Sequence, residues 1–208
     1  MNNALDIGSN LSTGWETFTK NAVAMILGLF LVALVGGVSL GICLGPLILG
    51  YNRMVLRAVR GEQVSPGDVF SGFDKFGPAF VLMLLMGLAI GVGFMLLFIP
   101  GLILGYLFYW SFWFMAAGED SAVECMKKSS ALARADVGSG IVFVLVNGVI
   151  QGAGNAIPFG GLITGPVAMG MAGSGFLNAT QPPQAVDQYG QPMGQQGMQV
   201  QQQYGSPQ

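Results

Sequence analysis

Histidine is absent from this chain of 208 residues, and charged residues make up only 9% of it. A soluble globular domain usually carries about 25% charged residues, which keep its surface in water. Here hydrophobic residues reach 52%, so the composition excludes a water-soluble globule and indicates a protein surrounded by lipid. The net charge of −2 excludes the basic surface that nucleic-acid binding requires, and we expect no nucleic-acid partner.

Side chains suited to catalysis are equally scarce. Without histidine, the chain lacks both the commonest general base and the commonest metal ligand. Its two cysteines, Cys43 and Cys125, are far apart and have no CxxC or Cys/His spacing that would suit a metal or redox site. No acidic pair lies within an apolar run. We therefore expect a non-enzymatic protein without a cofactor or a metal.

Long uncharged runs are what the sequence has instead, at residues 21–52, 76–118 and 137–186. The apolar core of a bilayer takes roughly 20 helical residues, so each run has room for a hairpin of two segments. Proline and glycine interrupt each run and predict the turns. The predicted turn residues are Pro46, Pro100, Gly101 and Pro158. The expected fold is an all-α membrane protein of three helical hairpins, with about six membrane segments.

The second arm of the first hairpin departs from this pattern. A helix over residues 47–60 is only about 21 Å long, and it carries Arg53, Arg57 and Arg60. We expect this arm to be short or re-entrant, with its arginines reaching the lipid headgroups. A five-segment alternative stays open, in which residues 21–52 cross once and the N-terminus lies outside.

The segments at the bases of the hairpins predict amphipathic helices at the membrane surface. Apolar residues recur at spacings of three and four before residue 20, and a second helix begins at Ser65-Pro66 with three phenylalanines on one face. A third helix opens with a capping-box pattern at Ser121. The residues expected at the membrane interface are Trp15, Phe18, Arg53, Arg57, Arg60, Phe70, Phe73 and Phe76. Trp110 and Trp113 are expected in an aromatic belt.

The order of segments follows from these boundaries. It comprises an N-terminal interfacial helix (1–20), a first hairpin (21–60), a connector (61–76), a second hairpin (77–118), a connector (119–136), a third hairpin (137–178) and a disordered Gln/Gly/Pro tail (179–208). With three returning hairpins, all eight Lys and Arg residues lie on one side. The positive-inside rule makes that side cytoplasmic, with both termini there and the tail available to a protein partner.

Small and polar residues inside the apolar runs are expected to hold the helices together. Several glycine pairs have GxxxG spacing, which lets helix backbones approach closely, and bulky substitutions at Gly91, Gly152 or Gly165 are expected to loosen the fold. Asn147, Gln151 and Asn155 recur every four residues and form one polar stripe. Such a stripe must face protein or water, as hydrogen-bond glue between helices or as a hydrated path.

Three segments of the chain resemble a known group of membrane proteins. These segments are Gly45-Pro46-Leu47-Ile48-Leu49-Gly50-Tyr51, Phe70-Ser71-Gly72-Phe73 and Ile99-Pro100-Gly101-Leu102-Ile103-Leu104-Gly105-Tyr106. Over residues 20–178 the chain resembles a broad group of small polytopic bacterial inner-membrane proteins of unknown function. The resemblance implies the bacterial inner membrane as location and assigns no catalytic residue.

Two functions are compatible with these features. The first is a membrane protein that organises or shapes the bilayer, as a homo-oligomer, because amphipathic helices on one leaflet increase the area occupied there. The alternative is a passive channel or small-solute transporter with a polar path along Asn147, Gln151 and Asn155. No Asp, Glu, Lys or Arg lies deep in an apolar run, so an ion-coupling site has no obvious carrier.

Overall fold

Helices make up the secondary structure of this chain. The computed structural model describes residues 5–96, 98–156 and 160–180, and this part contains no strand, which confirms the expected all-α class. The elements are α1 (Ile7–Val38), α2 (Leu44–Val59), the 3₁₀ helix η1 (Pro66–Lys75), α3 (Phe76–Leu96), α4 (Phe98–Phe108), α5 (Ser111–Ala116), α6 (Ala122–Ala135), α7 (Val137–Asn155) and α8 (Gly161–Thr180).

Four helical stretches are long and apolar enough to cross a membrane. They are Ile7–Val38, Pro66–Leu96, Phe98–Ala116 and Val137–Gly154. Three of the long helices have one face of large apolar side chains that the described part of the protein leaves exposed. These side chains recur at spacings of three and four: Val23, Leu27, Phe30, Leu34 and Val38 on α1; Val81, Leu84, Leu88 and Val92 on α3; Val142, Leu145 and Val149 on α7. Lipid tails suit such faces, and the chain is compatible with an integral membrane protein.

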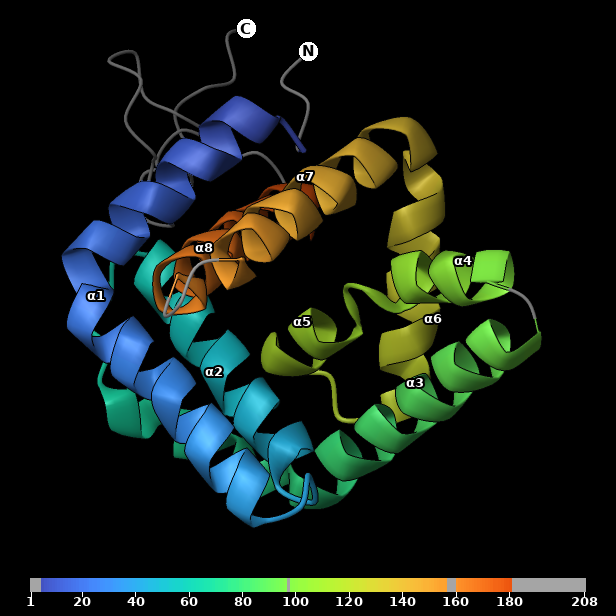
Figure 1. Ribbon diagram of the computed structural model, residues 1–208, viewed down its shortest axis with the longest axis horizontal. Helices are drawn as coiled ribbons and strands as arrows, with labels where there is room; N and C mark the ends of the chain where they lie inside the picture. Colours follow the sequence, from blue (N-terminus) through green and yellow to red (C-terminus); the bar gives the residue numbers. More distant parts are fainter. Residues whose placement is uncertain (1–4, 97, 157–159, 181–208) are drawn as a thin grey trace, which may run out of the picture.

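The two remaining long helices, α2 and α8, lie inside the bundle. α2 packs against α1, η1, α3, α5 and α8, and α8 also packs along α1 and α7 (Figure 1). Leu47, Met54 and Val55 of α2 and Met171 of α8 are fully buried. Hence α2 is an internal helix, and the six-segment count stays a prediction.

Trp110 and Trp113 also belong to the core. Both are almost fully buried, and their rings lie 6.2 Å from the ring of Phe176 on α8. Trp110 also contacts Phe143 of α7, at 5.7 Å between ring centroids. The expectation of an aromatic belt is therefore wrong for these two residues, because the ends of α4 and α5 turn into the bundle (Figure 1).

The predicted turn prolines lie within helices. α1 ends at Val38, the chain turns through Leu40 and Gly41 with positive φ, and Pro46 follows in the first turn of α2. Pro100 and Gly101 likewise lie in the first turn of α4. The amides of a first helical turn have no partner within the helix, so proline loses nothing there. These prolines begin the returning helix and do not form the bend, and Pro158 lies outside the described residues.

Glycine lets the inner helices approach each other closely. A Cβ atom added at Gly50 of α2 would collide with the backbone of Val69 on η1, and one at Gly72 of η1 would collide with the backbone of Pro46. At the other side of the bundle, a Cβ at Gly14 of α1 would lie 2.6 Å from the backbone nitrogen of Met171. Only glycine allows these backbones to pack in direct contact.

Candidate functional site

The helix η1 arranges its side chains in three rows. A 3₁₀ helix has three residues per turn, so residues three apart lie directly above one another. Val69 and Gly72 form the buried row against α2, while Asp68, Ser71 and Asp74 form a polar row. The third row consists of Phe70, Phe73 and Phe76, and we call it the aromatic row. The helix begins with the predicted Ser65 cap, in which Ser65 and Asp68 form a capping box.

The aromatic row is exposed, and its contact with the membrane stays a prediction. Phe70 is 43% exposed, and Phe73 and Phe76 are each 37% exposed. Their ring centroids lie 6.1 Å and 6.0 Å apart, and Phe80 of α3 continues the series at 6.1 Å. Contacts between neighbouring rings limit the freedom of each side chain, so the row is a preformed apolar ridge.

The arginines of α2 hold the polar row of η1. Arg53 Nη1 donates to Asp74 Oδ1 at 2.8 Å and to the carbonyl of Ser71 at 2.7 Å. Arg57 Nε donates to Glu62 Oε2 at 2.8 Å, and its Nη1 donates to Asp68 Oδ2 at 3.1 Å. Both arginines therefore have acidic partners within the protein, and their predicted contact with the lipid headgroups stays a prediction. Arg60 is exposed and has no ion pair among the described residues.

The N-terminal part of α1 is only partly a surface helix. Trp15 is 55% exposed, and its place at the interface stays a prediction, whereas Phe18 is buried. Asn10 is buried as well and accepts hydrogen bonds from Ser174 at 2.7 Å and from Asn178 at 3.0 Å, both on α8. This half of α1 packs along α8, and Phe18 lies on the packed face. α1 has a break at Asn21, where the apolar half begins.

The polar stripe of α7 is bonded within the protein. Asn147 is buried, and its Nδ2 donates to the carbonyl of Ala168 on α8 at 2.7 Å. Gln151 Nε2 donates to Asn147 Oδ1 at 2.8 Å. The bond from Asn147 joins α7 to α8 as hydrogen-bond glue, and the bond from Gln151, within α7, holds the Asn147 side chain in place. The side chain of Asn155 lies outside the described residues.

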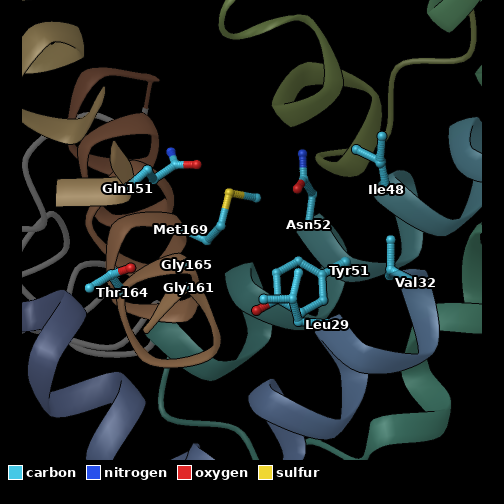
Figure 2. A pocket seen from close by; sticks show the side chains of 10 residues that line it. All are labelled: Leu29, Val32, Ile48, Tyr51, Asn52, Gln151, Gly161, Thr164, Gly165 and Met169. Carbon is cyan, nitrogen blue, oxygen red and sulfur yellow. The ribbon is translucent and has the colours of Figure 1, made fainter. Parts of the chain in front are cut away.

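A cavity of about 250 Å³ lies beside this stripe, between α1, α2, α7 and α8 (Figure 2). We call it the central cavity. None of the described residues that line it is charged, and all ten are buried or half-buried. Leu29, Val32, Ile48, Tyr51 and Met169 supply apolar surface, and Asn52, Gln151 and Thr164 supply polar groups. Figure 2 shows the amides of Asn52 and Gln151 on opposite walls of the cavity.

The sequence does not single out Asn52. Asn52 precedes Arg53 in a helix that was expected to end at the lipid headgroups. From sequence, its amide is therefore assigned to the polar, charged end of that helix. The available signal is the apolar surroundings on α2, where Ile48, Leu49 and Leu56 occupy the neighbouring helical positions. A polar residue enclosed in this way on a buried helix indicates a specific contact.

Within the described residues, no group of three or more acidic or cysteine side chains comes together to hold a metal. Comparison with models of protein families, with curated proteins and with solved structures finds no match to this chain. The site must therefore be interpreted from its own geometry. The aromatic row and the central cavity are its two distinctive features.

Proposed function

We propose that this protein is a non-enzymatic integral protein of the bacterial inner membrane that organises or shapes the bilayer. The observation that carries the proposal is the aromatic row along η1 and the first residue of α3, which presents three exposed, mutually tilted rings beside Asp74 and Lys75. Charged groups next to exposed rings are typical of the level where lipid headgroups meet the apolar core. Both termini are then cytoplasmic, together with η1.

The opposite end of α3 has a different character. Met95, Leu96 and Phe98 are strongly exposed there, and the neighbouring residues 76–118 carry no charge. About 30 Å of helix separates this end from Phe76, which equals the thickness of a bilayer core. An extra helix with an exposed aromatic row thus occupies one leaflet beside α3, and in the described residues the other leaflet holds only the adjoining ends of α3 and α4. Such an unequal cross-section favours curvature or clustering.

The energy available from the aromatic row is sufficient for membrane contact. If each ring has roughly 200 Å² of surface, the exposed parts of the three rings amount to about 240 Å². At about 25 cal/mol per Å², covering this area with lipid contributes up to about 6 kcal/mol. This energy would hold η1 in the interface, with its polar row tied to α2.

An oligomer would concentrate this effect. Gly87 and Gly91 on α3 have open space where a Cβ would stand, and so do Gly148 and Gly152 on α7. Both pairs have GxxxG spacing, which suits close contact with a helix of a second copy. The Gln-rich tail offers a contact for a protein partner.

The test is reconstitution of the protein into liposomes, imaged for tubulation or clustering. Replacing Phe70, Phe73 and Phe76 by Ser is expected to weaken any change of vesicle shape and to leave the fold intact. The matched control replaces Met95, Leu96 and Phe98 by Ser, which removes three exposed apolar side chains at the other end of α3. This control is expected to retain the effect.

The same vesicles test the alternative. If wild-type protein never alters vesicle shape but passes a small solute, and replacing Asn147, Gln151 and Asn155 by Leu abolishes that flux, then the channel hypothesis replaces the proposal. Equal loss of shape change in the test and control variants would also contradict it, since general surface hydrophobicity would then explain the effect.

A further inference from the structure

One buried acceptor in the central cavity has no partner. Asn52 is only 2% exposed, and its Oδ1 accepts no hydrogen bond within the described part of the chain. Other buried amides are bonded, as Asn147 is to the carbonyl of Ala168 and Asn10 is to Ser174. A buried polar atom without a partner destabilises the protein that contains it, so its presence requires an explanation.

The place of Asn52 supplies that explanation. Its amide points into the central cavity, toward the wall that carries Gln151 (Figure 2). Ser111 Oγ is the other buried polar atom without a partner in the described residues, but Ser111 does not line this cavity. Among the described residues, Asn52 is therefore the one whose unpartnered buried acceptor lines this cavity. An occupant of the cavity that carries an O–H or N–H group would satisfy it.

We propose that the central cavity binds one small neutral amphiphile, an alcohol or a primary amide with an apolar body. The absence of a charged lining residue favours a neutral ligand, since a buried ion would have no counter-charge. The polar end would donate to Asn52 Oδ1. The apolar body would lie against Leu29, Val32 and Met169, which lie among the apolar side chains of the cavity wall.

The size of the ligand follows from the volume. A cavity of about 150 Å³ holds benzene, with its six carbon atoms, so 250 Å³ accommodates about ten non-hydrogen atoms. Leu29 and Val32 lie midway along the apolar half of α1, so the cavity is at membrane depth. A molecule that partitions into lipid therefore reaches the site more readily than a charged solute does.

The polar wall is fixed before the ligand binds. Gln151 donates its amide hydrogen to Asn147 Oδ1 at 2.8 Å, and Asn147 is held in turn by α8. Thr164 is held by its hydrogen bond to the carbonyl of Gly160 at 3.2 Å. A ligand would therefore meet polar groups that are already oriented, which lowers the entropic cost of binding.

The experiment uses the full-length chain in detergent micelles, with 2-phenylethanol as the probe and propylbenzene as its apolar isostere. Thermal unfolding is measured against probe concentration, for wild type and for Asn52→Leu. We expect 2-phenylethanol to raise the melting temperature of wild type saturably. Asn52→Leu should weaken this response at least tenfold, and propylbenzene should bind wild type at least tenfold more weakly than the alcohol.

The variants control for trivial outcomes. Asn52→Leu removes an unpartnered acceptor at nearly constant volume, so the variant without probe should melt at or above the wild-type temperature. Asn52→Ala is the second variant and should lose the response too. Ser111→Ala, which removes the other unpartnered buried group, should keep it. Both proteins experience the same micelle, so any effect of the probe on detergent cancels in the comparison.

Three results would overturn the proposal. They are a melting temperature that does not respond saturably to the alcohol, a response equal in wild type and Asn52→Leu, and equal binding of propylbenzene. The first result would show that the cavity holds water and no amphiphile. The last would show that the cavity binds apolar molecules without recognition of a polar group by Asn52. Because the measurement involves no vesicle, its failure is independent of the bilayer-shaping proposal.

Discussion

Individual glycines in this protein differ sharply in what surrounds them. Gly50 and Gly72 lie where α2 and η1 cross, with no room for a side chain, whereas Gly91 and Gly152 have no atom within 4 Å of the added Cβ position. At Gly165 the added atom would meet only the end of the Leu29 side chain, at 3.1 Å, which can move aside. The expectation that Gly91, Gly152 and Gly165 hold the fold together therefore does not apply within one chain.

This contrast predicts opposite effects of the same substitution. Gly50→Ala would force α2 away from η1 and should lower the free energy of unfolding by about 1–3 kcal/mol or more. Gly152→Ala adds a methyl group in open space and should leave stability unchanged or raise it by up to about 1 kcal/mol, because alanine favours the helix. Unfolding in mixed detergent micelles measures both. Equal stability of the two variants would contradict the close crossing.

Cys125 gives a second prediction for a single residue. It is fully buried on α6, and burial, aided by the negative charge of Glu119, raises the pKa of its thiol to about 11. The thiolate is the reactive form, and at pH 7.5 fewer than about one thiol in a thousand is ionised. N-ethylmaleimide should therefore modify Cys125 in denatured protein and leave it unmodified in folded protein, as followed by mass spectrometry. Equal rates in the two states would contradict this packing.

Among the elements, η1 illustrates what the sequence can predict. Its start is predicted by Ser65 and Pro66, and its exposed aromatic face by the three phenylalanines. Its 3₁₀ form corresponds to a repeat of residue types every three positions, with Val69 and Gly72 buried and the acidic residues in a row of their own. This repeat can be recognised only when the arginine partners on α2 are known. Tertiary ion pairs cannot be inferred from local spacing.

The turns show the opposite case. Proline was expected to mark the bend, yet Pro46 and Pro100 lie just after it, as Pro66 and Pro78 lie in the first turns of η1 and α3. A general rule explains all four: the first turn of a helix does not need the amide hydrogens that proline lacks. Asn52 could not be identified from sequence, because its significance depends on a cavity that four separate helices form.

Two helix caps predict how stability depends on pH. Asp6 accepts a hydrogen bond from the backbone amide of Ser9 at 2.7 Å, and Asp136 accepts one from the backbone amide of Ser139 at 3.1 Å. The pKa of each carboxyl group lies below its usual value of 3.8, at Asp6 mainly because of the Ser9 amide, and at Asp136 because of the Ser139 hydroxyl first and its amide second. A carboxyl group whose pKa is lower in the folded state than in the unfolded state stabilises the protein fully at pH values above its unfolded-state pKa. This stabilisation is lost as the pH falls through the pKa of the carboxyl group in the folded state.

The expected result is a melting temperature that falls as pH is lowered from about 5 to about 3. The double variant Asp6→Asn, Asp136→Asn should melt lower than wild type at pH 6, and its melting temperature should fall less over the acidic range. Thermal unfolding in a detergent that carries no charge provides the measurement. Identical pH profiles for the two proteins would show that the caps do not titrate as described.

At the scale of the whole molecule, segments far apart in sequence meet through their polar ends. Lys75 donates to the carbonyl of Gly118 at 3.2 Å and forms an ion pair with Asp120, so the end of η1 lies beside the start of the second charged connector. Asn10 on α1 meets Asn178 near the end of α8 at 3.0 Å. Both contacts agree with hairpins that return to the side from which they began.

This arrangement predicts a single side for every charged segment. In a variant that lacks Cys43 and Cys125, single cysteines at Ser12, Gln63 and Lys127 should react with a membrane-impermeant maleimide only in inside-out vesicles, since the positive-inside rule places them in the cytoplasm. A cysteine in place of Met95, which is 91% exposed at the far end of α3, should react only from the other side. If the cysteine at Ser12 alone reacted from the periplasm, residues 21–52 would cross the membrane once and the five-segment topology would be correct. The unequal cross-section on which the bilayer-shaping proposal depends would then have to arise from η1 and α6 without the N-terminal helix.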